Sequence, residues 1–297
     1  MKEKTRGIIL NIILYIAAFA IALIPFIRIE NIFASLAAFT ATATLVIYIV
    51  TCFYPDTSLY DPYWSVAPPV MLVIAIIKYK LYNANAFFIT LFVFVWALRL
   101  TANWAATYKG LGHEDWRYAK YRQKYGKLTF ALINFAGLQF IPTIVVYAGL
   151  VGAIFSIQVE TFTPKIFVGL IVMLAGTGLE YVSDKAIHEF LRENSGKKLT
   201  CRKSIWKYTR HPNYLGELMF WCGIFLVFFA LRRDIWYYGL GFLLIIALFL
   251  FISIPMMEKH NMERRVDYED YKAKTSMLIP LPPKNTEYVS EQENRAL

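Results

Sequence analysis

Long apolar segments alternate with short polar ones along almost the whole chain. Each apolar segment has the roughly 18 or more residues that a helix needs to cross a bilayer. The pattern therefore predicts an all-α fold, a polytopic membrane helix bundle of seven to eight transmembrane helices, with seven spans if one segment is re-entrant. The apolar segments lie at residues 7–27, 32–53, 65–82, 84–104, 128–156, 165–186, 213–231 and 235–257.

The N-terminus allows two interpretations. The letters M-K-E-K-T-R before an apolar run are typical of a signal peptide, and Ala18-Phe19-Ala20 offers a weak small-x-small cleavage site. The apolar run continues through Ile27, however, which is long enough to span a bilayer. We therefore expect an uncleaved first helix. The predicted parts are a transmembrane hairpin at 1–54, a membrane domain at 55–283 and a polar tail at 284–297.

Composition and charge agree with a membrane protein. Of the residues 58% are hydrophobic and 18% are charged, whereas about a quarter of a soluble domain is charged. If the N-terminus is cytoplasmic, the inside segments carry 25 of the 31 lysines and arginines, so the positive-inside rule predicts that both termini are cytoplasmic. The net charge of +10 then reflects topology and contact with anionic lipid heads, and we expect no nucleic-acid partner. The inside segments are residues 1–6, 54–64, 99–127, 185–212 and 258–297.

The stretch Trp206 to Gly223, W-K-Y-T-R-H-P-N-Y-L-G-E-L-M-F-W-C-G, carries a dense polar cluster at a predicted membrane boundary. Polar groups at such depths are costly unless they have partners, so they mark a functional site. Pro212 suits the first turn of a helix starting near Asn213, and the free N–H groups of that turn attract phosphate or carboxylate. The cluster comprises Arg210, His211, Asn213, Tyr214 and Glu217.

Other polar side chains fall on the same predicted side. Arg99 and Asn103 end the fourth apolar segment, where snorkelling alone would also explain Arg99. Glu180, Asp184 and His188 are spaced i, i+4, i+8 and share one helix face. That spacing resembles metal ligation, but no second histidine cluster supports it, so we predict a polar wall and no metal site. The last apolar segment ends near Glu258 and His260.

Two further expectations concern local structure. Arg117, Arg122 and Lys124 fit an amphipathic helix on the membrane surface. Gly176 and Gly178 are expected to allow close helix approach.

No G-x-G-x-x-G or P-loop occurs where it can work, so a nucleotide would be held by helix ends and loops. The arginines, lysines and helix start at one pole suit a phosphate-bearing cofactor, and the long helices suit a flat or apolar substrate.

The motifs resemble those of the steroid 5-alpha-reductase-like membrane proteins, and most closely the bacterial branch labelled DUF1295. The resemblance covers about residues 55–283 and four loops in order. The matching motifs are D-x-Y-W-S (Asp61 to Ser65), W-x-x-R-L-x-x-N (Trp96 to Asn103), E-x-x-x-D (Glu180, Asp184), the stretch Trp206 to Gly223, and E…Y-x-x-Y…I-P (Glu258, Tyr268, Tyr271, Pro280).

The resemblance implies an NADPH-dependent reductase of a carbon–carbon double bond in a steroid-like or other lipid enone. It implies that Asn213, Tyr214 and Glu217 line the cofactor site, with Asp184 and His260 facing it. Arg210 and His211 are then expected near the cofactor phosphates. Arg99, Asn103, Glu180 and Glu258 are expected to complete the cofactor-binding set.

The substrate half departs from the family. Where animal steroid reductases have a glutamate and a tyrosine on the early helices, this chain has the Asp61-Pro62-Tyr63-Trp64 stretch and Trp96. An indole does not protonate a developing enolate, so Asp61 or Tyr63 is the expected acid, or the substrate differs. The stretch around Asp61 is also explained as a turn with an interfacial aromatic anchor.

Two other functions stay open. Membrane methyltransferases of the isoprenylcysteine carboxyl type share R-H-P-x-Y-x-G and the terminal E…Y-x-x-Y, and bind S-adenosylmethionine. A non-catalytic membrane protein is the third possibility, although it leaves the polar cluster unexplained. The resemblance suggests a bacterial inner membrane, while the sequence leaves the substrate and the oligomeric state open.

Overall fold

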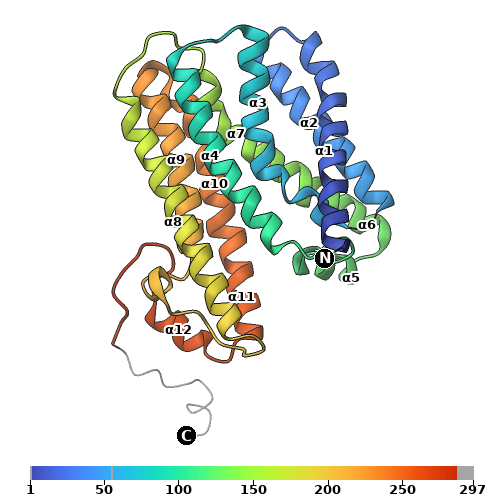
Figure 1. Cartoon of the computed structure of the whole chain (residues 1–297), viewed down its shortest axis with the longest axis vertical. Coiled ribbons are helices and arrows are strands. Elements are labelled where there is room, and N and C mark those ends of the chain that lie inside the picture. The colour runs from blue at the N-terminus through green and yellow to red at the C-terminus, as the bar shows by residue number, and fades with distance from the viewer. Residues whose placement is uncertain (1, 55, 286–297) are drawn as a thin grey trace, which may run out of the picture. The chain divides into compact units, whose positions relative to one another are not determined.

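The structure is a computed structural model that describes residues 2–54 and 56–285, and these residues are mainly helical (Figure 1). The described residues contain eight helical stretches long and apolar enough to cross a membrane, which confirms a multi-pass integral membrane protein and favours eight spans over seven. Residues 286–297 of the predicted tail lie outside the described residues. The eight stretches are Glu3–Arg28, Ile32–Phe53, Thr57–Tyr79, Ala84–Thr107, Lys127–Ser156, Ile166–Glu193, Pro212–Leu231 and Arg233–Arg264.

Several helices continue past the apolar segments that predicted them. The fourth span, α4 (Ala84–Thr107), and the sixth, α8 (Ile166–Glu193), each run beyond the apolar letters into polar sequence. Hydropathy marks where the bilayer contact ends, whereas a helix continues for as long as its residues favour helical backbone. Arg99, Asn103 and Asp184 lie inside these helices, as the predicted segments 84–104 and 165–186 imply, and α8 also takes in His188 and Arg192.

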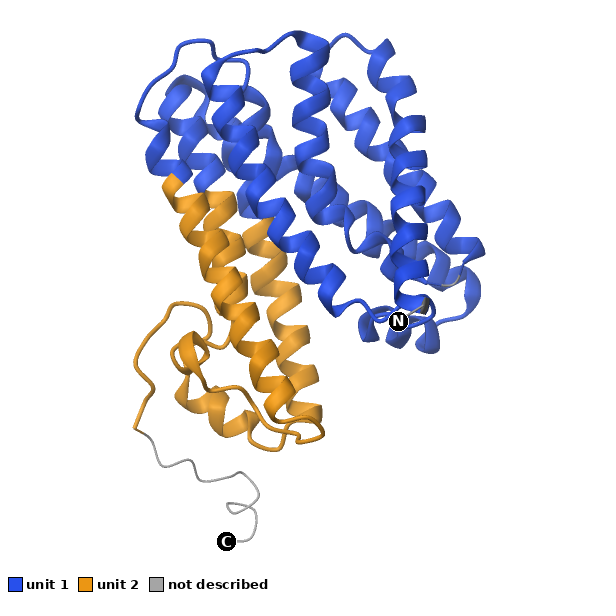
Figure 2. Cartoon of the chain, in the orientation of Figure 1, with its two compact units in different colours: residues 1–170, 223–244 blue, residues 171–222, 245–297 orange. Residues whose placement is uncertain are grey.

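The chain forms two compact units (Figure 2). Unit 1 comprises residues 1–170 and 223–244, and unit 2 comprises residues 171–222 and 245–297. The helices that lie wholly in unit 1 are α1 (Lys2–Arg28), α2 (Ile32–Phe53), η1 (Thr57–Tyr60), α3 (Tyr63–Tyr79), α4, α5 (Trp116–Lys124), α6 (Lys127–Leu132), η2 (Ile133–Phe140), α7 (Ile141–Ser156) and η4 (Arg233–Gly241). Those wholly in unit 2 are η3 (Ser204–Lys207), η5 (Phe249–Ser253), α11 (Ile254–Arg264) and α12 (Tyr268–Lys274). The helices α8, α9 (Pro212–Leu231) and α10 (Phe242–Leu248) contribute residues to both units.

In unit 1, α1 packs against α2, and α3 packs against α4. The helix α7 contacts α2, α3 and α4 and so lies at the centre of the unit. Its span is interrupted by the π-helical stretch η2, which widens the turn. As a result Asn134 and Gln139, five positions apart, both donate from their side-chain nitrogens to Thr51 Oγ1, at 3.2 and 3.0 Å.

Glycine pairs set the distance between α8 and α9. In unit 2, a Cβ on Gly176 would lie 2.5 Å from the Gly216 carbonyl oxygen, and in unit 1 a Cβ on Gly169 would lie 2.6 Å from that of Gly223. Side chains at these positions would force the backbones apart. The prediction of close approach is confirmed for Gly176 and wrong for Gly178, where an added Cβ meets no atom within 4 Å.

Candidate functional site

The polar cluster of unit 2 is built around the start of α9. The helix begins at Pro212, as the sequence predicts, and His211 immediately precedes it. The His211 ring stacks on the Tyr214 ring, with centroids 5.2 Å apart and planes 9° apart. Tyr214 in turn meets Phe249 edge to face, at 4.9 Å. This packing fixes the direction of the two polar rings at the helix start.

Glu258 joins the start of α9 to the end of the last span. Its Oε1 atom accepts hydrogen bonds from Arg210 Nε at 2.8 Å and lies 3.4 Å from His211 Nε2. Its Oε2 atom pairs with Lys272 Nζ at 2.9 Å. The side chains of Arg210 and Glu258 are 9% and 8% exposed, so this is a buried charge cluster. Such a pair persists only when its remaining polar atoms are also hydrogen-bonded.

Arg210 satisfies that condition with main-chain acceptors. Its Nη1 atom donates to the carbonyl oxygens of Lys272, at 2.9 Å, and of Thr275. With Nε and Nη2 both on Glu258, four of the five guanidinium N–H groups are engaged. Contact between Arg210 and a cofactor phosphate stays a prediction, and only one N–H is left to make it.

The loop before α9 is held by the chain that follows α12. Thr209 pairs with Ser276 in an isolated β-bridge, and its hydroxyl donates to the Leu278 carbonyl oxygen at 2.9 Å. The Tyr271 hydroxyl donates to the carbonyl oxygens of Trp206, at 2.5 Å, and Thr209, at 3.2 Å. These contacts give the tyrosine of the terminal motif a positioning role for the loop that carries Arg210.

Burial affects the protonation of His211. Desolvation is the largest influence and lowers the pKa of the imidazole below its usual value, although the Glu258 carboxylate opposes this. His211 is therefore neutral at pH 7 and can accept a hydrogen bond through one ring nitrogen.

The first turns of α9 carry two more predicted site residues. Asn213 Oδ1 is buried and has no hydrogen-bond partner among the described residues. Glu217 is 6% exposed, and its Oε1 atom accepts from Trp221 Nε1 at 2.9 Å. Trp221 thus orients the Glu217 carboxylate. A buried amide oxygen without a donor is costly, so Asn213 Oδ1 is able to accept a ligand N–H group, and among the predicted site residues it lies at the helix start.

The acidic face of α8 contacts α9 where Glu180 packs against Gly216. Glu180 is 1% exposed and lies against Gly216, where an added Cβ would come within 2.5 Å of Glu180 Cγ. Asp184 is half-buried, whereas His188 is exposed. His260 lies on α11, with Nε2 3.3 Å from Arg264 Nη1. Among the described residues no group of three or more His, Cys, Asp or Glu could hold a metal ion.

Unit 1 holds the remaining predicted residues, Asp61, Tyr63, Arg99 and Asn103. Asp61 Oδ1 accepts a hydrogen bond of 2.5 Å from the Tyr118 hydroxyl. Burial, followed by the nearby charge of Asp61, raises the pKa of Tyr118 well above its usual value, so this phenol stays a donor. Arg99 and Asn103 lie one turn apart on α4, and both are partly exposed.

Tyr63 is the less accessible of the two predicted acids. It is completely buried, stacks on Tyr60 at 5.1 Å, and its hydroxyl contacts the hydroxyl and the carbonyl oxygen of Thr40. A substrate would have to displace that contact first, so Asp61 is better placed. Trp96 is also fully buried.

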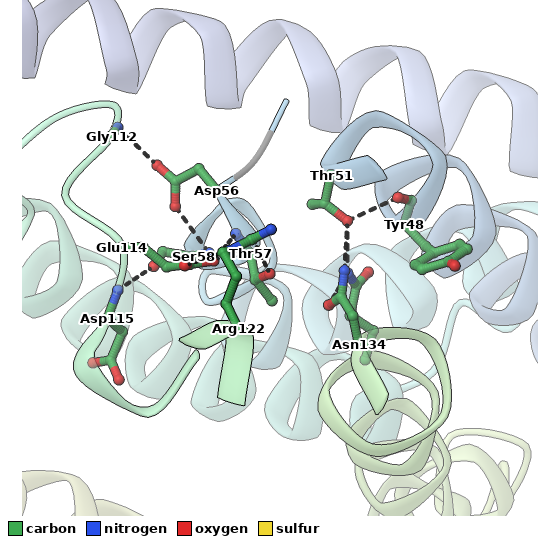
Figure 3. A network of polar contacts seen from close by, with 11 residues as sticks. Tyr48, Thr51, Asp56, Thr57, Ser58, Gly112, Glu114, Asp115, Arg122 and Asn134 are labelled. Carbon is green, nitrogen blue, oxygen red and sulfur yellow. Dashed lines mark hydrogen bonds and ion pairs between the residues drawn. The ribbon is translucent and has the colours of Figure 1, made fainter. Parts of the chain in front are cut away.

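Sequence reasoning missed a polar network that fixes the entrance to α3 (Figure 3). Asp56 caps η1 through the Ser58 N–H at 3.1 Å and accepts from the Gly112 N–H at 3.2 Å. Glu114 accepts from the Thr57 N–H at 3.0 Å. The network spans positions more than 50 residues apart, and only the Asp-x-Ser spacing at the start of η1, an N-cap signal, was visible in the sequence.

Arg122 completes this network from the predicted surface helix, α5, whose presence the structure confirms. Its Nε and Nη2 atoms bond both oxygens of Glu114, at 2.9 and 2.7 Å. Its guanidinium also lies 4.2 Å from the centre of the Phe130 ring. Burial favours the neutral form of Glu114, but the hydrogen bonds from Arg122 and Thr57 outweigh it and lower the pKa of the carboxyl group. The paired hydrogen bonds from Arg122 also link α5 to η1 through Glu114.

Comparison with known families gives one match. A model of the family described as "Protein of unknown function (DUF1295)" matches residues 47–275, more than half of the chain. The match begins within α2 and ends just after α12, so every predicted site residue falls inside it. No curated protein and no solved structure matches the chain.

Proposed function

Because this chain belongs to the DUF1295 family, and its motifs resemble those of steroid 5-alpha-reductase-like proteins, we propose that it is a membrane-embedded reductase. It uses NADPH to reduce a carbon–carbon double bond of a steroid-like or other lipid enone. The lipid bilayer supplies the substrate. The positive-inside distribution of lysine and arginine supports a start of α9 that faces the cytoplasm, where nucleotides are available.

The observation that carries the proposal is the buried Asn213 Oδ1 at the start of α9, which has no hydrogen-bond donor among the described residues. A carboxamide or adenine amino group of NADPH offers the N–H that this oxygen needs. The stacked His211 and Tyr214 rings flank the same turn, and the first N–H groups of α9 suit a phosphate. Glu217, held by Trp221, accepts hydrogen bonds from ribose or amide groups.

The remaining residues have two kinds of role: some hold the loop before α9 in position, and one donates a proton to the substrate. Bound NADPH supplies the hydride that goes to the β carbon of the enone. Arg210, Glu258 and Lys272 hold the loop before α9 in place. Asp61, hydrogen-bonded to Tyr118, is the proposed acid that neutralises the enolate oxygen.

A rival function rests on the same contacts. Arg210, His211, Glu258 and Tyr271, which are hydrogen-bonded around the loop before α9, belong to motifs that isoprenylcysteine-type methyltransferases also have. S-adenosylmethionine also carries an adenine amino group for Asn213. The two functions are therefore separated by ligand binding and not by the fold.

The test is a ligand titration on the purified full-length protein in detergent, with thermal unfolding as readout. A ligand at 100 times its dissociation constant stabilises by about 2.7 kcal/mol. We expect NADPH to raise the unfolding temperature and S-adenosylmethionine to leave it unchanged. The reverse result would replace the reductase by the methyltransferase, and no shift with either ligand would reject both.

Variants locate the site. Asn213→Ala and Glu217→Ala are expected to remove the NADPH shift. Asn85→Ala is the matched control, since Asn85 is a buried asparagine of unit 1 that donates to the Val159 and Thr161 carbonyl oxygens. If Asn213→Ala and Glu217→Ala both keep the full shift, the cofactor site lies elsewhere. Asp61→Asn should keep the NADPH shift and lose double-bond reduction.

A further inference from the structure

Unit 2 has an open depression of about 570 Å³ on the surface of α8. Three α8 residues, Gly178, Leu179 and Val182, form one wall. The segment at and after η3 forms the other wall with Ile205, Lys207 and Tyr208. The volume is within the range of sites that hold a small organic ligand. We call this feature the α8 groove.

Gly178 creates the groove. An added Cβ at this position would meet no atom within 4 Å, so the space above the glycine is open. The opposite wall is fixed, because Trp206 Nε1 donates to the Ser183 carbonyl oxygen of α8 at 2.9 Å. The η3 segment is therefore held beside α8 without filling the space over Gly178.

The groove is separate from the proposed cofactor residues. Residues of an α-helix are about 100° apart around its axis, which puts Gly178 and Val182 on one side of α8 and Glu180 and Asp184 on the opposite side. The groove side carries exposed apolar side chains, with Val182 47% exposed. In a membrane-spanning helix such a surface faces lipid tails.

Positive charge lies at one end of this apolar surface. Lys185 follows Val182 by three positions and Gly178 by seven, so it lies on the groove side of α8. Lys207 belongs to the opposite wall of the groove, and both lysines are exposed. Tyr208, also in that wall, is 39% exposed and suits the boundary between lipid heads and tails.

The geometry points to a binding site for an anionic phospholipid in the α8 groove. One acyl chain lies over Gly178 between Val182 and Ile205, and the phosphate lies between Lys185 and Lys207. The apolar side chains that line the groove favour a lipid over a free phosphate ion. The two lysines favour an anionic head group over a zwitterionic one. This site does not depend on the proposed reaction.

The test measures lipid retention by the full-length protein. Purified protein in mild detergent is titrated with phosphatidylglycerol or phosphatidylcholine, and bound lipid is counted by native mass spectrometry. The variant Lys185→Gln/Lys207→Gln is expected to bind phosphatidylglycerol roughly 30-fold more weakly. Each lysine near an anionic head group raises the binding affinity about fivefold, and the variant loses both. Lys197→Gln/Lys198→Gln, in the exposed loop after α8, is the charge control and should bind like wild type.

A second pair of variants tests the groove itself. Gly178→Leu fills the space, and Val182→Trp does so from the next turn in case the first variant folds poorly. Ile171→Phe adds volume to an exposed α8 position two turns away and is the control. We expect both filling variants to lose the lipid and the control to keep it. Retention by folded Gly178→Leu and Val182→Trp, or equal binding of the two lipids by wild type, would overturn the inference.

Discussion

Arg210 and Glu258 form a buried pair in which Nε and Nη2 of the arginine both approach the same carboxylate oxygen at 2.8 Å. Removing one partner of a buried pair leaves an uncompensated charge, which costs about 3–5 kcal/mol. We therefore expect Glu258→Ala to lower the free energy of unfolding by at least about 3 kcal/mol. The double variant Arg210→Met/Glu258→Ala should cost less than the sum of the single variants.

Chemical denaturation of the detergent-solubilised protein measures this difference. The more exposed pair of Arg202 and Asp270, with side chains 40% and 28% exposed and also 2.8 Å apart, is the control. Arg202→Ala should cost no more than about 1 kcal/mol, because solvent screens the pair. Additive effects of the Arg210 and Glu258 substitutions would show that the pair is not coupled.

The glycines of α8 give a prediction about packing. A Cβ on Gly176 would lie 2.5 Å from the Gly216 carbonyl oxygen, whereas a Cβ on Gly178 meets nothing within 4 Å. Gly176→Ala should therefore destabilise the protein by about 1–3 kcal/mol through overpacking. Gly178→Ala, two positions away on the same helix, should be neutral or stabilise by up to about 1 kcal/mol. Thermal unfolding of the two variants decides this, and equal unfolding temperatures would contradict it.

His211 gives a prediction about pH. Burial lowers the pKa of this imidazole in the folded protein, so the unfolded chain binds a proton at a higher pH than the folded protein does. The free energy of unfolding should therefore decrease as the pH falls below about 6.5, the pKa of an unperturbed histidine. His211→Gln should lose less stability than wild type between about pH 7.5 and 5.5. His188→Gln, at an exposed position, should behave like wild type, and identical pH profiles for wild type and His211→Gln would exclude this role.

Arg122 gives a prediction for unit 1. Its guanidinium fork bonds both oxygens of Glu114, and a lysine cannot reproduce two parallel hydrogen bonds. Arg122→Lys should lower the free energy of unfolding by about 1–3 kcal/mol. Arg117→Lys is the control, since Arg117 bonds one oxygen of Asp115 and is 36% exposed. Limited proteolysis of the segment around residues 108–115 should accelerate in the Arg122 variant alone.

The sequence was enough to predict seven to eight spans, of which the structure has eight, a helix start near Pro212 and Asn213, and the helix α5. These features follow from local properties: segment length, a proline at a first turn and the spacing of basic residues. The helix ends were less predictable, because polar residues such as His188 and Arg192 continue α8 beyond the predicted end at residue 186.

Features that depend on contacts between distant residues were not predictable. Asn134 and Gln139 share a face only because η2 is a π-helix, and an ordinary helix would place them well apart. The hydrogen bonds of Arg210 to Glu258 and to two carbonyl oxygens were equally unpredictable from the sequence. All three acceptors lie 48 or more residues further along the chain. The openness above Gly178 follows from how η3 packs, which no single-helix pattern contains.

The position of Glu258 also has a consequence for biosynthesis. Arg210 leaves the ribosome 48 residues before the carboxylate that neutralises it, and the main-chain acceptors of Lys272 and Thr275 come later still. During translation the loop before α9 thus carries an uncompensated cation until the eighth span has been inserted. Completion of this loop is therefore a late event in the synthesis of the chain, because Arg210 has its full set of partners only once Thr275 has been made.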